Sequence, residues 1–167
     1  SGQFITVDAA KVTDLAGNAG NVLYNSLAYA IDTESPTVTG VNSSTANGTY
    51  KIGDLISIQI AFSEAVTVFG TPQLTLETGA VDRLASYVAG SGTTTLSFSY
   101  TVQNGDASTD LDYASALALA LGGGSITDGV GNGAVLTLAA PAATGSLGAN
   151  KALVIDGVPP WFSDFDM

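Results

Sequence analysis

The sequence contains no cysteine and no histidine, and each absence removes a class of function. Without them the chain cannot form disulfide bonds, a zinc site of the usual kind, or a catalytic site built on histidine or cysteine. Basic residues are scarce, because only four Lys and Arg stand against fifteen Asp and Glu. The net charge of −11 argues against binding to nucleic acid or to an anionic membrane, since both need a basic face.

Long hydrophobic runs are also missing. No apolar run reaches the roughly 18 residues of a membrane span, and no signal-peptide pattern opens the sequence. Apolar residues nevertheless make up 46% of the chain, which is too many for a disordered acidic segment. The composition favours Thr, Ser, Val, Ala, Gly and Asp over the residues typical of helical bundles. Such a composition predicts short strands joined by tight turns.

Strand patterns recur along the chain at short spacing. In 55–62 every second residue is apolar, and the same alternation returns in 95–102 and 73–77, as expected for strands with one buried face. Weaker candidates are 37–41, 83–88, 135–138 and 152–155. Tyr113–Leu121 is open to two interpretations, a short helix from its Ala and Leu content or a strand with an irregular start, and we favour the strand. About seven short strands predict an antiparallel sandwich.

Two segments of the chain repeat in the same order. Residues 12–18 resemble 126–132, and Ala28–Asp32 followed by Pro36 resembles Ala152–Asp156 followed by Pro160. A tandem array with an insertion in the second copy explains both matches. We therefore predict that residues 1–32 are the C-terminal strands of a preceding repeat, that 33–157 form a complete repeat, and that 158–167 begin the next repeat or form a tail. An incomplete strand ribbon has open edges, so 1–32 is expected to pair with the main domain or with a neighbouring chain.

Several phrases of the chain resemble the bacterial immunoglobulin-like (Big) repeats of large surface adhesins and cadherin-like surface proteins. The phrases are Asp32–Val38, Ile60–Val66, Gly70–Leu76, Ser97–Val102, Thr127-Asp128 with Gly131-Asn132, and Lys151–Asp156. Two features depart from the pattern. The Asp-x-Ala-Gly-Asn turn is intact at Asp14–Asn18 but altered at Asp128–Asn132, and the repeat exceeds the roughly 100 residues of a simple sandwich.

The resemblance implies an all-β fold, an immunoglobulin-like antiparallel β-sandwich with Greek-key connections. It also implies a structural repeat, extracellular or on the bacterial cell surface, often stiffened by calcium, and it does not imply catalysis. Its partners would be neighbouring repeats of the same polypeptide, with strand exchange between copies as a further possibility. Nucleic acid and membrane insertion are not expected.

The sandwich topology brings acidic residues together at its two ends. Following the strand directions, Glu64 and Asp128 should meet Asp32 and Glu34 at the end where the chain enters. Like charges at short distance repel, and calcium, which takes six to eight oxygen ligands, would offset that repulsion. The predicted metal ligands at this end are Asp32, Glu34, Glu64, Asp128 and Asn132.

Further acidic residues should gather at the opposite end. Asp106, Asp110 and Asp112 share one loop there, and Asp156 leaves the domain toward the next repeat. Asp14 occupies, in the first copy, the place of Asp128. All five belong to the predicted ligand set, although the loop lacks the spacing of an EF-hand and each acid could instead be a solvated turn residue.

These observations predict a structural spacer repeat of a large bacterial surface adhesin, not an enzyme. Glu77 and Asp82 could form a glycosidase pair, but no aromatic cleft accompanies them. Two alternatives remain open. The sandwich could be a glycan- or protein-binding module of a surface protein, or it could be a subunit of a surface-layer lattice.

Overall fold

The fold was obtained as a computed structural model, which describes residues 2–3, 6–7, 13–19, 24–25 and 29–159. The chain divides into two compact units, Ser1–Glu34 and Ser35–Met167. The predicted tail beyond residue 159 lies outside the described residues. Within them, no helix is long and apolar enough to cross a membrane.

The first unit contains short antiparallel ladders. β1 (Gly2–Gln3) pairs with β4 (Tyr29–Ala30), and β2 (Thr6–Val7) pairs with β3 (Tyr24–Asn25). An isolated antiparallel bridge joins Thr13 to Ala19 and closes the Asp14–Asn18 turn.

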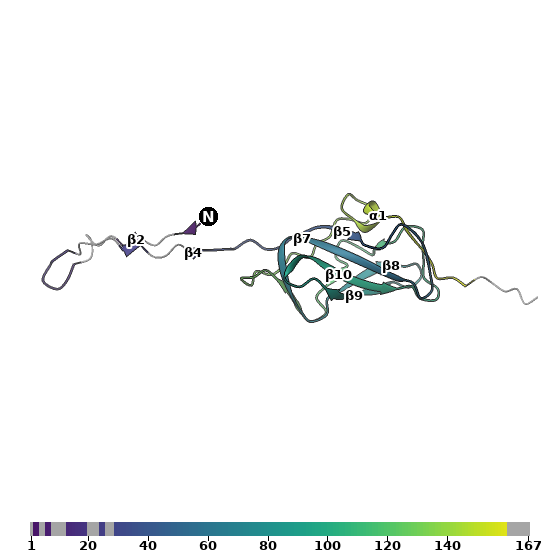
Figure 1. Cartoon of the computed structure of the whole chain (residues 1–167), viewed down its shortest axis with the longest axis horizontal. Coiled ribbons are helices and arrows are strands. Elements are labelled where there is room, and N and C mark those ends of the chain that lie inside the picture. Colours follow the sequence, from purple (N-terminus) through teal and green to yellow (C-terminus); the bar gives the residue numbers. More distant parts are fainter. Residues whose placement is uncertain (1, 4–5, 8–12, 20–23, 26–28, 160–167) are drawn as a thin grey trace, which may run out of the picture. The chain divides into compact units, whose positions relative to one another are not determined.

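The second unit is an all-β sandwich (Figure 1). In the larger sheet β8, β9 and β10 follow one another as hairpin neighbours, and β7 lies beside β10 instead of β8, which is a Greek-key order. The smaller sheet has the order β11-β15-β6, and its β6–β15 pair is parallel. The elements are β5 (Val38–Ser43), β6 (Gly48–Lys51), β7 (Leu55–Phe69), β8 (Gln73–Glu77), β9 (Arg83–Ala89), β10 (Thr93–Thr101), β11 (Ala107–Ser108), β12 (Asp112–Tyr113), β13 (Leu119–Ala120), β14 (Ser125–Thr127), α1 (Leu147–Asn150) and β15 (Leu153–Asp156).

Alternating side chains of β7 and β10 build the core. Ile56, Ile58 and Ile60 of β7 are fully buried, as are Leu96 and Phe98 of β10. The smaller sheet adds its own buried side chains from β15 to the same apolar cluster. Each of these residues contributes about 1.5–3 kcal/mol by leaving water. The alternation read from the sequence is thus confirmed as the inner face of the sandwich.

β7 is longer than the sequence pattern predicted, because Val66 and Val68 continue its alternation to Phe69. The register with β10 shifts between Thr93 and Thr95, which marks an irregularity in the ladder. Beyond that point β7 pairs with β14 from Thr67 to Phe69. Glu64 stands between these two halves of the strand.

Two sequence predictions need correction. Residues 135–138 form no strand. The N–H of Val135 donates to the carbonyl of Pro36, and the N–H of Leu138 donates to the carbonyl of Ala116. Because these acceptors belong to different segments, no continuous strand ladder forms. The stretch from Tyr113 to Leu121 is interrupted, since a turn separates β12 from β13. Both short strands pair with β8. The short helix α1 was not predicted; Ser146 caps its N-terminus, with the Ser146 hydroxyl oxygen accepting the N–H of Ala149.

The turn between β9 and β10 depends on Gly90. Its φ of 111° is unfavourable for other residues, and an added Cβ would collide with the Thr95 carbonyl oxygen. Gly92, in the same turn, has a φ of 83° but nothing within 4 Å of its Cβ position. An alanine substitution at Gly92 therefore measures the cost of backbone strain without a collision.

We expect Gly90→Ala to destabilise the sandwich by about 3 kcal/mol or more, because the backbone must move. Gly92→Ala should cost only about 1–2 kcal/mol from its φ alone. Urea unfolding of both variants measures the difference. Equal losses would show that the contact with Thr95 does not constrain this turn.

Candidate metal centre

The Asp128 turn presents a buried, well-bonded carboxylate. Its Oδ1 accepts the backbone N–H groups of Val130 at 2.9 Å, Gly131 at 2.6 Å and Asn132 at 2.8 Å. Its Oδ2 accepts the side-chain amide of Asn132 at 2.7 Å. Gly131 permits this tight loop, since its φ of 103° suits glycine. Asn132, a predicted ligand, therefore has its amide nitrogen engaged in orienting Asp128.

These bonds keep Asp128 charged. Burial by itself would raise the pKa of the carboxyl group, but the backbone and side-chain hydrogen bonds from Asn132 and those from Val130 and Gly131 outweigh it. The net effect holds the pKa of Asp128 below its ordinary value. The side chain is only 4% exposed, so the site combines a fixed negative charge with little solvent.

The same turn is built a second time around Asp14. Asp14 Oδ1 accepts the N–H groups of Ala16 and Asn18, each at 2.9 Å, and Oδ2 accepts the Asn18 amide at 2.9 Å. In both turns the Asp N–H bonds the Asn carbonyl oxygen at 3.0 Å. The side-chain bond from Asn18 also lowers the pKa of Asp14. The two turns thus share the bonds from the residues two and four positions after the Asp, but differ in the glycine N–H, which bonds the backbone carbonyl of Asp14 in one turn and the carboxylate of Asp128 in the other.

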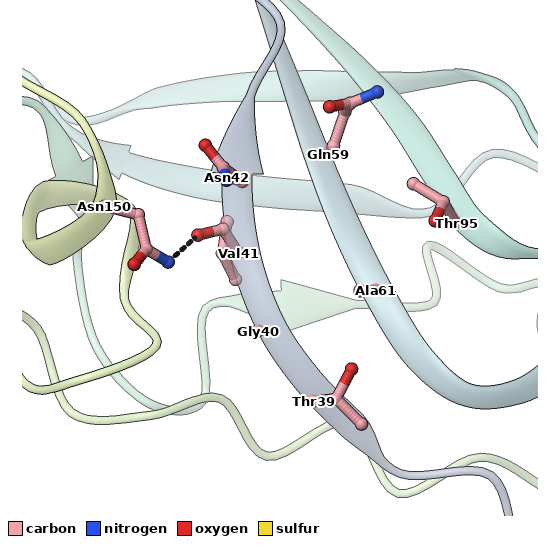
Figure 2. A pocket seen from close by; sticks show the side chains of 8 residues that line it. All are labelled: Thr39, Gly40, Val41, Asn42, Gln59, Ala61, Thr95 and Asn150. Carbon is pink, nitrogen blue, oxygen red and sulfur yellow. Dashed lines mark hydrogen bonds between the residues drawn. The ribbon is translucent and has the colours of Figure 1, made fainter.

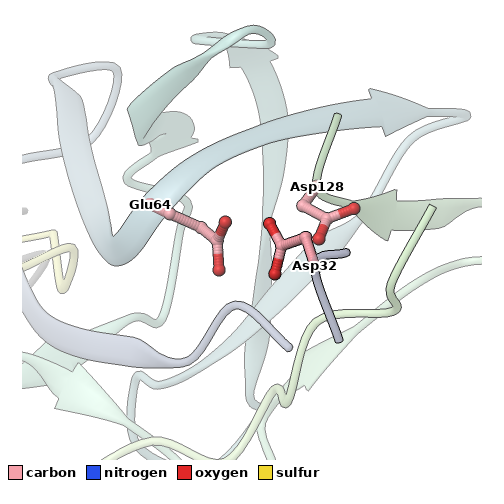
Figure 3. A group of neighbouring side chains, drawn as sticks. All are labelled: Asp32, Glu64 and Asp128. Carbon is pink, nitrogen blue, oxygen red and sulfur yellow. The ribbon is translucent and has the colours of Figure 1, made fainter. Parts of the chain in front are cut away.

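Asp32 and Glu64 complete a group of three carboxylates with Asp128 (Figure 3). One carboxylate oxygen from each residue lies within 4.8 Å of the others. Figure 3 shows the three side chains pointing toward one another from three separate segments of the chain. Asp32 is exposed and Glu64 half-buried. Asp32 Oδ1 also accepts the N–H of Glu34 at 3.1 Å, which closes a short turn.

Hydrogen bonds fix the strand segment that carries Glu64. Ser63, its neighbour on β7, donates its N–H to Thr37 at 2.9 Å, and its hydroxyl oxygen accepts the Thr37 N–H at 3.0 Å. The carbonyl of Pro36 accepts the N–H of Val135 at 2.8 Å. The segment just before β5, β7 and the segment after β14 are therefore joined by hydrogen bonds.

The arrangement suits a hard cation. Three carboxylates at short range repel one another, and a divalent ion would offset this repulsion. Calcium binds oxygen at about 2.3–2.6 Å, so ligands on opposite sides of the ion are about 4.6–5.2 Å apart. Separations of 4.8 Å or less are short enough for the three oxygens to contact one ion, and they do not distinguish one oxygen-binding cation from another. The acidic triad of Asp32, Glu64 and Asp128 could thus hold a metal ion.

The remaining predicted ligands fall into different environments. Within the part of the chain that the structure describes, the triad is the one group of three acidic side chains close enough for an ion. Glu34 is exposed and does not belong to it, and Asp14 lies in the turn of the first unit. Asp156 is exposed and pairs through its backbone with Ala107, while Asp110 is exposed on the loop before β12.

Asp106 is engaged by protein groups. Its Oδ1 forms an ion pair with Nε of Arg83 at 2.7 Å. Its Oδ2 accepts the Tyr100 hydroxyl at 2.6 Å and the Gln103 N–H at 2.8 Å. The side chain is 1% exposed. Asp106 was predicted as a metal ligand, and its pairing with Arg83 was not predicted. Arg83 is the sole arginine of the sequence and lies in a predicted strand, which is the signal that could have indicated an ion pair.

Asp112 is likewise occupied by the backbone. Its Oδ1 accepts the Tyr113 N–H and its Oδ2 accepts the Ala142 N–H, each at 2.9 Å. The residue is buried where β12 meets the loop before α1. Asp112 therefore anchors that loop, and it belongs to no group of three acidic side chains among the described residues.

Three lowered carboxyl pKa values predict loss of stability in acid. For Asp106, burial would raise the pKa, but the bonds from Tyr100 and Arg83 outweigh it and the pKa is lowered; Asp14 and Asp128 are also lowered. Stability from these groups is complete above the unfolded value of about 3.9 and is lost as pH falls through the folded values. We expect the urea midpoint, measured in chelator, to drop below about pH 4. Asp106→Asn should flatten that drop, and an unchanged slope would contradict the assignment.

Comparison with protein-family models, with curated proteins and with solved structures finds no match for this chain. A function for the chain must therefore be inferred from its own residues. Two features bear on it, the repeated Asp turn and the acidic triad.

Proposed function

We propose that this chain is part of a tandem array of sandwich repeats, and that the array serves as a structural spacer in a large bacterial surface protein. The main support is the turn built around both Asp14 and Asp128. Two loops that share Asp, Gly and Asn at the same spacing, and the hydrogen bonds between that Asp and Asn, are expected from a repeated domain. On this proposal, the first unit holds the last strands of one repeat and the second holds the next repeat.

Calcium is the cation that we propose for the acidic triad. The hard oxygen donors favour it over metals that prefer nitrogen or sulfur ligands. Three carboxylates fall short of the six to eight oxygens that calcium takes, so backbone carbonyls and water would supply the rest. Asp32 precedes the sandwich in sequence, so a bound ion would tie that segment to Glu64 and Asp128. We propose that this link stiffens the array.

Location and partners follow from the same proposal. A chain with net charge −11 suits an extracellular rod kept soluble by self-repulsion, with calcium relieving the repulsion locally. The partners would be neighbouring repeats of the same polypeptide, and the open strands of the first unit allow exchange with another copy. The proposed role is mechanical and needs no catalytic group.

Small-angle scattering of the full chain, in calcium and in chelator at equal ionic strength, tests the stiffening. We expect chelation to change the maximum dimension while circular dichroism of the sandwich stays the same. Glu64→Gln should resemble the chelated state even in calcium, and Glu34→Gln should behave as the parent chain does. Identical scattering of the parent chain with and without calcium would refute the spacer mechanism.

A further inference from the structure

The outer face of the larger sheet is uncharged where β5, β7 and β10 lie side by side. Across β7 and β10, Ser57 faces Ser99, Gln59 faces Ser97 and Ala61 faces Thr95. On the other side of β7, Asn42 of β5 faces Gln59. These side chains alternate with the buried core residues and therefore point outward. A neutral face is notable in a chain with a net charge of −11.

A hollow of about 240 Å³ lies on this face. Its lining contains no acidic, basic or aromatic residue, and comprises Thr39, Gly40, Val41, Asn42, Gln59, Ala61, Thr95 and Asn150. Figure 2 shows these residues spread over the three strands, with Asn150 at one side near α1. The small residues Gly40 and Ala61 leave room for a ligand to approach the strands. The hollow is smaller than the roughly 300–1,000 Å³ of enclosed ligand sites, so it suits a short part of a longer molecule.

The hollow is held by regular structure. Asn150 donates its side-chain amide to the carbonyl of Val41 at 2.8 Å, as Figure 2 shows, and the N–H of Val41 bonds Gly145 at 2.8 Å. The edge of β5 that faces away from β7 is therefore hydrogen-bonded to the segment that contains α1. Polar side chains on paired strands lose little freedom when a ligand binds, which favours even a weak site.

We propose that this hollow binds a neutral glycan through its amide and hydroxyl groups. Thr hydroxyls and Asn or Gln amides both donate and accept hydrogen bonds, as sugar hydroxyls do. An anionic ligand would be repelled by the chain, and a cation would find carboxylates elsewhere but none here. Without an aromatic ring for stacking, the affinity of one site is expected to be about millimolar.

Amide NMR spectra of the full chain test this proposal with maltotriose, cellotriose and mannotriose as probes. We expect at least one of them, at about 20 mM, to shift the amide signals of the lining residues in a saturable way. Gln59→Ala should weaken that binding about tenfold, because it removes both a donor and an acceptor. Ser99→Ala, on the same face but outside the hollow, should bind as the parent chain does. Both substitutions are on the outer face, and the dispersion of the spectrum reports whether each variant is folded.

Three results would overturn the proposal. The first is that none of the three sugars shifts a signal at that concentration. The second is that the shifted signals lie away from the hollow. The third is that the two folded variants bind equally well. Shifts that depend on protein concentration and not on sugar would show that this face contacts a second copy instead.

Discussion

Calcium should raise the unfolding temperature of this chain by several degrees, and a chelator should reverse the effect. An ion that binds only the folded state adds about 2.7 kcal/mol at one hundred times its Kd. For a domain of this size, each kcal/mol raises the midpoint by about 2–4 °C. We therefore expect a rise of about 5–10 °C near saturation, measured by calorimetry at matched ionic strength.

Two glutamates give a matched pair of variants for this experiment. Glu64 belongs to the triad, whereas Glu34 is an exposed acid that does not. The difference between calcium and chelator should nearly vanish in Glu64→Gln and persist in Glu34→Gln. Because each variant is compared with itself, any effect of the substitution on the metal-free fold cancels. A calcium effect of equal size in both variants would mean that ions act through the general acidity of the chain.

Asp106→Ala should be among the most destabilising single changes in the sandwich. It leaves the guanidinium of Arg83 without its partner and removes the acceptor for the Tyr100 hydroxyl and the Gln103 N–H. Breaking a buried ion pair from one side costs about 3–5 kcal/mol. Arg83 retains 25% exposure of its side chain, so we expect the lower part of that range. Urea unfolding at neutral pH measures the loss.

Asp82→Ala is the control for this effect. Asp82 is the exposed neighbour of Arg83, and an exposed substitution of this kind changes stability by about 0.5 kcal/mol or less. It removes the same charge from the same region of the chain. If Asp106→Ala and Asp82→Ala lost equal stability, the buried network would contribute nothing beyond net charge. Tyr100→Phe should give an intermediate loss, since it removes one hydrogen bond and keeps the ion pair.

The strands that bury one face were predictable from sequence, because alternation is a direct consequence of strand geometry. β8 has the predicted bounds, β7 extends beyond its predicted end to Phe69, and β10 runs from Thr93 to Thr101 where 95–102 was predicted. The segment around Val135 was predicted as a strand and is not one. Its backbone N–H groups form single hydrogen bonds to the carbonyls of Pro36 and Ala116, and an apolar sequence pattern cannot distinguish such isolated bonds from a strand ladder.

Long-range contacts also limited the prediction of the candidate site. Strand directions in the expected sandwich topology predicted Asp32, Glu34, Glu64 and Asp128 at one end. The structure groups the carboxylates of Asp32, Glu64 and Asp128, without Glu34. For Asp106 and Asp112 the sequence shows only acidic loop residues. Their partners, Arg83 and the N–H of Ala142, come from distant segments, and which carboxylate meets which donor depends on packing.

Calorimetric titration of calcium into the full chain shows whether the acidic triad is a metal site. We expect saturable binding at the triad, lost in the Asp32→Asn/Glu64→Gln double variant and retained in Glu34→Gln. Absence of binding to the parent chain, or unchanged binding to the folded double variant, would contradict it.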